Sequence, residues 1–245
     1  MKKLQFLSLK LIALSFFVLT TLALHATEFR FRGLTYTLLT DSTVEVSGID
    51  TAYIGGVSIL DEVIHDSVAY TVVAIGNSAF EYAKGVNYVM LPSTVRQIGD
   101  SAFKGCVSLG AIATPAGLLS LGKAAFSGCT SLRSISLPDT MLSIGESAFA
   151  SCRSLISASI GYGVKGIESH TFSECRSLTS VTIPKSVVFI GTGSFDYCQS
   201  LKSIYCHAVT PPTLGTYNIF GGCAKELKVY VPASAVKAYK KSSRW

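Results

Sequence analysis

Residues 129–149 read CTSLRSISLPDTMLSIGESAF, and this stretch decides the fold. Its first half fits the L-x-x-L-x-L pattern of a short strand, with the apolar positions filled by Leu132, Ile135 and Leu137. Pro138 then ends the strand, because proline has no N–H to donate to a β-ladder. Gly145 is expected to make a tight turn, after which Phe149 is large enough to fill the back of the coil. The stretch therefore predicts one complete turn of a coiled chain.

The same positions recur along the chain with a fixed period of 23 residues. The clearest marker is a phenylalanine, found at Phe80, Phe103, Phe126, Phe149, Phe172 and Phe195, with Phe220 following after 25 residues. A constant period of this length is typical of a solenoid, in which one repeat cannot bury its apolar face alone and stacks on its neighbours. We therefore expect a single elongated domain whose coils lie ~4.8 Å apart along a parallel sheet.

Residues 1–26 have the composition of a secretory signal peptide. Three lysines (Lys2, Lys3 and Lys10) precede an apolar run over residues 11–24, and Ala26 offers a small residue for cleavage. A membrane anchor is the alternative, but the run is shorter than the ~20 residues that a spanning helix needs. We expect an exported protein with no transmembrane segment in the mature chain. It would be secreted or held at the cell surface, with the periplasm as a further option.

Loss of residues 1–26 would remove three lysines and lower the formal net charge from +6 to +3. A charge this small gives no strong field for nucleic acid or an anionic membrane, so no nucleic-acid partner is predicted. The exception is the C-terminal tail, where a single acid, Glu226, lies among Lys225, Lys228, Lys237, Lys240, Lys241 and Arg244. We interpret this cluster as a solvated end cap, with a polyanion site as the alternative.

Six of the seven cysteines lie three residues after a repeat phenylalanine, namely Cys106, Cys129, Cys152, Cys175, Cys198 and Cys223. In an exported protein such a ladder could form disulfides. Stacked side chains should instead point in parallel into the core, and Ala83 takes this position in the first coil. We therefore favour buried free thiols that act as small apolar residues. No histidine recurs beside them and the sequence has no C-x-x-C pair, so neither a metal site nor a cofactor is predicted.

The segments at both ends depart from the regular repeat. Residues 27–73 alternate apolar and polar side chains, as at Phe29 and Phe31, which is typical of strands. We expect them to form a β-rich N-terminal cap that covers the first open coil. Residues 74–209 hold the 23-residue repeats, and residues 210–245 hold the terminal repeat and a C-terminal cap.

The motif I-G-x-x-A-F-x-x-C-x-S-L-x-S-I-x-L-P occurs almost verbatim at residues 98–115, 121–138 and 144–161, with the last residue altered in the third copy. Over roughly residues 74–232 the chain resembles leucine-rich repeat proteins of the bacterial surface-antigen-like (BspA-type) class. The end of the chain, from Thr210 onward, is similar to the terminal cap of Bacteroidetes members. The resemblance implies a right-handed leucine-rich repeat coil with a parallel β-sheet on one face. It also implies extracellular binding, often adhesion to host or bacterial proteins.

The residues between the core positions of each strand should point outward onto the sheet surface, because successive side chains of a strand alternate. By register, the candidate binding face consists of Tyr88, Met90, Ser134, Ser136, Ser157, Ser159, Ser180, Thr182, Ser203 and Tyr205. The centre of this strip carries small hydroxyls and its ends carry bulky residues. It could be a docking surface with Tyr88, Met90 and Tyr205 as anchors, since aromatic residues dominate binding hot spots. Alternatively, serine and threonine simply suit a solvated strand.

No pattern in the sequence supports catalysis. No pair of carboxylates recurs at one level of the stack, and adjacent residues such as Cys206 and His207 face opposite sides of a strand. We therefore predict a non-enzymatic protein that binds an extracellular protein or glycan through the sheet. A structural spacer or display scaffold without a specific ligand is the alternative function.

Overall fold

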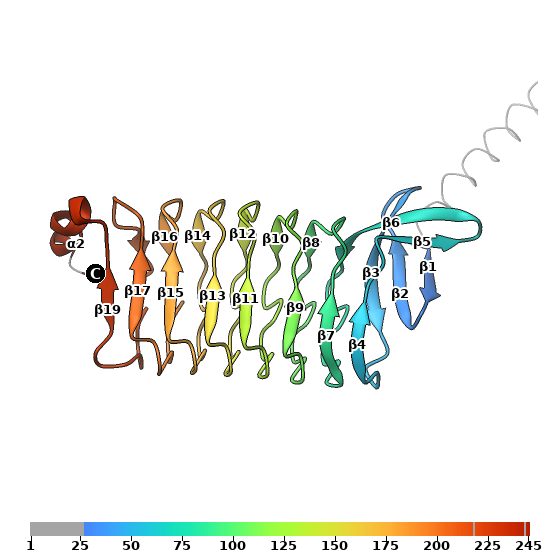
Figure 1. Cartoon of the computed structure of the whole chain (residues 1–245), viewed down its shortest axis with the longest axis horizontal. Helices are drawn as coiled ribbons and strands as arrows, with labels where there is room; N and C mark the ends of the chain where they lie inside the picture. Colours follow the sequence, from blue (N-terminus) through green and yellow to red (C-terminus); the bar gives the residue numbers. More distant parts are fainter. Residues whose placement is uncertain (1–26, 218, 243) are drawn as a thin grey trace, which may run out of the picture.

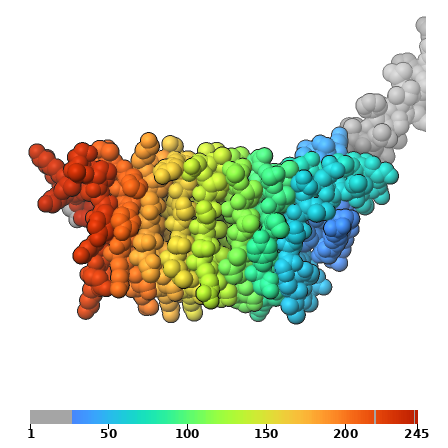
Figure 2. Space-filling model, viewed as in Figure 1, coloured from blue at the N-terminus to red at the C-terminus, as the bar shows by residue number. Residues whose placement is uncertain are grey.

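The computed structural model describes residues 27–217, 219–242 and 244–245. Over these ranges the chain forms an elongated parallel β-solenoid whose axis runs the length of the molecule (Figure 1). Figure 2 shows successive coils as side-by-side bands in sequence order, from blue at the N-terminal end to red at the C-terminal end. The predicted leucine-rich repeat solenoid is confirmed. The predicted signal peptide, residues 1–26, lies outside the described residues.

One side of the solenoid carries the longer strands of the repeat, which we call the front sheet. Its strands are β4 (Gly55–Ser58), β7 (Val86–Met90), β9 (Ala111–Ala113), β11 (Ser134–Ser136), β13 (Ser157–Ser159), β15 (Ser180–Ile183), β17 (Ser203–Cys206) and β19 (Lys228–Tyr230). They pair in parallel in the orders β4-β7-β9 and β11-β13-β15-β17-β19, and β9 and β11 are neighbours along the axis. Pairing follows the repeat, so that Ser134 lies opposite Ser157 and Ser157 opposite Ser180.

A second set of short strands forms where each coil returns, which the sequence pattern had not predicted. This set comprises β8 (Gln97–Ile98), β10 (Ser120–Leu121), β12 (Ser143–Ile144), β14 (Gly166–Ile167), β16 (Phe189–Ile190) and β18 (Thr213–Leu214). They also pair in parallel from coil to coil. Each strand is only two residues long, too short for the alternation that reveals a strand in a sequence. Two ladders rather than one therefore hold the coils in register.

The N-terminal cap is an antiparallel β-structure. It contains β1 (Glu28–Phe31), β2 (Leu34–Leu38) and β3 (Thr43–Ile49), and β3 then pairs in parallel with β6 (Val68–Ile75), which continues into the return ladder. β5 (Glu62–His65) pairs with β6 as a hairpin. Tyr36, Val44 and Val46 are at most 1% exposed, so this cap buries the first open face of the solenoid.

The C-terminal end carries the helical segments of the described chain, η1 (Ala233–Ala235) and α2 (Val236–Lys241). The hydroxyl of Tyr239 on α2 donates to the carbonyl of Ala208 at 3.0 Å. Because that hydroxyl has one hydrogen, the thiol of Cys206, 3.1 Å away, must donate to the tyrosine oxygen. The indole Nε1 of Trp245 donates to the carbonyl of Pro212 at 2.9 Å. These bonds attach the helical end to the last coils.

The repeat phenylalanines form one continuous stack through the core. From Phe80 to Phe195 each side chain is completely buried. Consecutive ring centroids, continuing to Phe220, lie 4.8 to 6.1 Å apart, with interplanar angles between 2° and 21°. Those separations fall in the range of favourable aromatic pairs and stay close to the ~4.8 Å spacing of paired strands. The stack therefore has the same rise as the two ladders.

The expectation for Gly145 was wrong in its physical reason. The φ of Gly145 does not lie in the left-handed region. Instead, a Cβ there would collide with the backbone carbonyl group of Gly122 in the preceding coil, so glycine is needed for close approach between coils. The left-handed conformation occurs two residues before the phenylalanine, at Ser101 (φ 54°), Ala124 (φ 53°) and Ser147 (φ 57°). Side chains other than glycine there carry a backbone strain that the neighbouring coils hold in place.

The predicted free thiols are confirmed. Cys223 is half-buried and the other five cysteines of the ladder are fully buried. Each ladder thiol donates a hydrogen bond to the carbonyl of the phenylalanine in the preceding coil, with distances of 3.0 to 3.2 Å. The interpretation as small apolar residues was therefore incomplete, since the S–H group also links adjacent coils. Burial raises the pKa of the Cys106 thiol to about 12 and that of Cys223 to about 11.

The phenylalanine stack predicts a graded loss of stability. Phe149→Ala in the middle of the stack should lower the free energy of unfolding by about 3–5 kcal/mol, as for other buried phenylalanines. Phe220→Ala should cost less, because Phe220 is only partly buried at the end of the stack. Leu142→Ala, at a side chain 61% exposed, is the control and should change stability by no more than about 0.5 kcal/mol. Urea denaturation measures all three, and equal effects of Phe149→Ala and Leu142→Ala would contradict the stack's role.

The thiol ladder predicts an order of chemical reactivity. Only a thiolate reacts quickly with maleimide, and the raised pKa values keep the ladder protonated at pH 7. We expect slow labelling of the native protein, with Cys223 reacting first and its rate rising as the pH increases toward about 11. In urea all seven cysteines should label quickly. Mass spectrometry identifies the labelled sites, Cys223→Ala is the control, and rapid labelling of several native thiols at pH 7 would contradict this assignment.

Candidate binding face

The structure places all ten residues of the candidate face on the outer side of the front sheet. The alternation within each strand causes this, as in β11, where Ile135 is 4% exposed while Ser134 and Ser136 are exposed. Ser180 and Ser203 are half-buried, and the other eight are exposed. Whether a ligand occupies this face stays a prediction, but the geometry that it requires is present.

The hydroxyls of the face form two straight rows along the solenoid axis. The strand register makes direct neighbours of Ser134, Ser157, Ser180 and Ser203 in one row, and of Ser136, Ser159, Thr182 and Tyr205 in the other. Within the described part of the chain, the serine and threonine hydroxyls of these rows donate no side-chain hydrogen bond to the protein. They are consequently available to a ligand or to water.

Bulky side chains lie at the two ends of these rows. Tyr88 and Met90 on β7 are 38% and 45% exposed. At the other end Tyr205 stacks on Tyr230 of β19, with ring centroids 5.0 Å apart and planes 14° from parallel. The candidate list missed Tyr230, although 25 residues separate it from Tyr205, the same spacing that separates Phe195 from Phe220. That shared spacing was the signal that could have identified β19 as a further strand of the face.

The border of the face is positively charged. The residue before each strand is exposed, and at this position Arg133 and Lys202 supply charge while Ile156 supplies an apolar surface 48% exposed. Lys202 contacts Glu226 at 3.7 Å, an exposed ion pair that contributes little to stability. Lys228 extends the positive border on β19, next to Ser203. The face therefore combines neutral hydroxyls with a basic margin.

A shallow hollow of about 560 Å³ adjoins the face where β13, β15 and β17 end. It is lined by Tyr162, Lys185 and His207, one residue from each of three successive coils. The sequence analysis had not grouped these residues, because they stand at unequal offsets in their repeats. An exposed phenol, an ammonium group and an imidazole are side chains that can bind polar or anionic groups. The hollow widens the candidate face beyond the strands.

The geometry offers no assembled catalytic or metal centre in the part of the chain that the structure describes. No group of three or more His, Cys, Asp or Glu residues is placed to hold a metal ion over the described ranges. Cys206 is buried and bonded to Tyr239, whereas His207 is exposed, so these neighbours do not form a nucleophile and base. Of the helices in the described ranges, none has the length and apolar character needed to cross a membrane.

Solved structures of bacterial leucine-rich repeat proteins share this fold. A leucine-rich repeat protein of T. pallidum is 28% identical with a TM-score of 0.73, over 89% of this chain and 96% of that one. A leucine-rich cell surface protein of Faecalibacterium prausnitzii is 26% identical with a TM-score of 0.63, over 77% of this chain but only 56% of that one. A Bacteroides ovatus leucine-rich repeat protein, 23% identical with a TM-score of 0.52 over 84% and 77% of the two chains, shares the fold alone.

Sequence comparison agrees with the structural similarity. No curated protein matches this chain. The model of the BspA-type leucine-rich repeat region matches residues 71–237 with six copies, which is more than half of the chain. The matched range begins in β6 and ends in α2, and so includes every coil that carries a stacked phenylalanine. This chain belongs to the BspA-type leucine-rich repeat family.

Proposed function

We propose that this protein is an exported, non-enzymatic leucine-rich repeat protein that binds an extracellular protein through the outer side of the front sheet and so supports surface adhesion. The observation that carries the proposal is the face itself: two rows of hydroxyls with exposed aromatic side chains at both ends. A glycan ligand and a purely structural spacer are the alternatives.

The face has the size of a standard protein interface. From β7 to β17 it extends over six neighbouring strands, which corresponds to roughly 24 Å at the ~4.8 Å spacing of paired strands. A typical partner buries about 800 Å² on each side, and a flat patch of that area is about 28 Å across. One domain of a partner protein could therefore cover the whole strip.

The chemistry of the face also suits a protein partner. Tyrosine supplies a rigid, amphipathic contact area at a low entropic cost, and serine supplies adaptable hydrogen bonds, which is why both are enriched in antibody binding loops. Tyr88, Tyr205 and Tyr230 provide the first kind of contact and the serine rows the second. Charged residues stay at the border, as they do in specific interfaces.

Other surfaces of the solenoid use their polar groups between coils. Lys104 pairs with Glu81 at 2.9 Å, and Lys123 pairs with Glu146 at 3.1 Å, each 23 residues away in the neighbouring coil. The hydroxyl rows of the front sheet make no such contacts among the described residues. This difference favours binding over a spacer role, because a spacer gains nothing from leaving one face unpaired.

Export rests on the composition of residues 1–26 and on similarity to surface proteins. The Faecalibacterium prausnitzii relative is itself described as a cell surface protein. A surface location would place the front sheet in contact with host or bacterial proteins. Adhesion is the function that such a location and such a face support together.

Removing the aromatic side chains should weaken capture of the partner. We expect Tyr88→Ala with Met90→Ala, and separately Tyr205→Ala with Tyr230→Ala, to raise the Kd at least ~30-fold, the effect of losing about 2 kcal/mol at a hot spot. Partners would be captured from extracellular-matrix and bacterial surface fractions, and their affinity measured by biolayer interferometry. Tyr82→Ala and Tyr197→Ala are matched controls, because both tyrosines are exposed but lie in the turns that follow Phe80 and Phe195.

Three outcomes would contradict the proposal in different ways. Equal weakening by the front-sheet variants and the controls would exclude this face as the site. Capture that survives protease treatment of the fraction but is lost after periodate oxidation would identify a glycan. Failure of the folded protein to capture any component would favour the spacer.

A further inference from the structure

The two ends of the solenoid are finished differently. At the N-terminal end β1, β2 and β3 cover the core, and Val44 and Val46 are fully buried beneath them. At the C-terminal end β19 is the last strand of the front sheet, and Lys228, Val229 and Tyr230 are all exposed (Figure 1). β19 pairs only with β17 among the described strands. This edge is therefore open to a further strand.

The backbone of β19 has hydrogen-bonding groups that face away from the solenoid. The N–H of Lys228 donates to the carbonyl of Lys202 at 2.9 Å, so Lys228 is bonded toward the preceding coil. Backbone groups of consecutive residues in an extended strand point to opposite edges. The N–H and C=O of Val229 consequently point away from β17, toward the place that another coil would occupy.

The side chains of β19 repeat the core pattern without being covered. Register places Val229 opposite Ile204, whose side chain is fully buried, yet Val229 is 36% exposed. Val231, one core position further along, is half-buried. The apolar positions of the last coil thus lack the neighbours that every earlier coil has.

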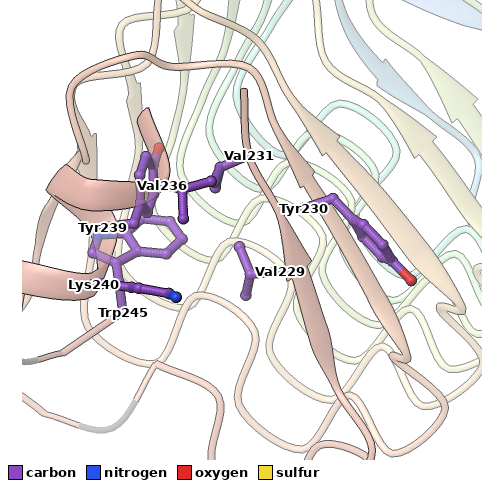
Figure 3. A pocket seen from close by; sticks show the side chains of 7 residues that line it. All are labelled: Val229, Tyr230, Val231, Val236, Tyr239, Lys240 and Trp245. Atoms are coloured by element: carbon purple, nitrogen blue, oxygen red, sulfur yellow. The ribbon is translucent and has the colours of Figure 1, made fainter. Parts of the chain in front are cut away.

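A pocket of about 390 Å³ occupies this end of the core (Figure 3). Val229 and Val231 form one wall, and Val236, Tyr239 and Trp245 form the other. Tyr230 lies apart from this apolar group and continues the outer face, where it stacks on Tyr205. A strand added beside β19 would point alternate side chains into the pocket, as the strands of the front sheet do within the core.

The charge around the pocket selects the partner. Exposed basic side chains gather here, at Lys225, Lys228, Lys237, Lys240, Lys241 and Arg244, and the acid among them, Glu226, already contacts Lys202. A second copy of this chain would bring the same positive charge, and lysine on an edge strand discourages self-pairing. An acidic segment would be attracted instead.

We propose that β19 binds an extended, acidic segment of another protein by strand addition. The segment's backbone would pair with Val229, an apolar side chain would fill the pocket, and carboxylates would meet the lysines, the arrangement known as β-augmentation. The cluster that the sequence suggested to be a solvated end cap then has a specific role. This site is separate from the outer face and does not depend on the function proposed for it.

Synthetic peptides test the three parts of the proposal separately. The probe is a fluorescein-labelled heptapeptide of alternating Glu and Val, titrated by fluorescence anisotropy in low salt. Comparison peptides replace Glu by Lys, or Val by Ser, or carry N-methyl groups on alternate backbone nitrogens. We expect each comparison peptide to bind at least tenfold more weakly, and binding of the Glu–Val probe to weaken as salt rises.

Variants locate the binding. Lys240→Glu and Val229→Asn should each weaken the Glu–Val probe at least tenfold, because one reverses a charge at the pocket and the other makes its wall polar. Lys165→Glu changes an exposed lysine in the middle of the solenoid and is the matched control, and Tyr88→Ala at the other end should also have no effect. Retained folding is checked by circular dichroism.

The proposal is overturned if the probe does not bind, if the Lys–Val peptide binds as well, or if Lys240→Glu leaves the affinity unchanged. A dimer in sedimentation velocity that excludes the probe would assign the edge to a second copy of the chain. Because Tyr88→Ala affects only the outer face, failure at β19 is distinguishable from failure of the adhesion function.

Discussion

Parallel stacking of one phenylalanine per coil is the constraint on which the structure depends. The rings from Phe80 to Phe195 are completely buried, and their centroid separations of 4.8 to 5.6 Å match the rise between paired strands. Two parallel ladders and a ladder of thiol hydrogen bonds share this rise. A coil with one residue more or fewer would shift all of these contacts together, so the 23-residue period is held by several interactions at once.

Equal rise turns single positions into rows, and the character of each row follows from its direction. The inward cysteine row loses reactivity, because burial raises the pKa of the thiols. The outward rows from Ser134 and Ser136 keep free hydroxyls on a flat sheet. Binding surface is thus what this architecture offers, and the two ends of the solenoid, where rows stop, carry the bulky or charged groups.

Much of this was predictable from residues within one repeat. The alternation around Ile135 located the outward serines, and the recurrence of Cys152 after Phe149 located the inward thiols. Contacts between coils were not predictable in the same way. The thiol donors, the reason for Gly145, the pair formed by Tyr205 and Tyr230, and the hollow near His207 depend on how neighbouring coils lie, which a period alone does not specify. The open edge at β19 escaped for the same reason, since exposure of Val229 depends on a coil that does not follow.

A photo-crosslinking amino acid tests most directly whether the front sheet is the binding surface. Benzoylphenylalanine would replace either Tyr205, on the face, or Tyr197, in the turn after Phe195 of the same coil; the native side chains are 42% and 54% exposed. With a captured partner present, irradiation should cross-link the partner through position 205 and not through position 197. Cross-linking through position 197 alone would contradict the account.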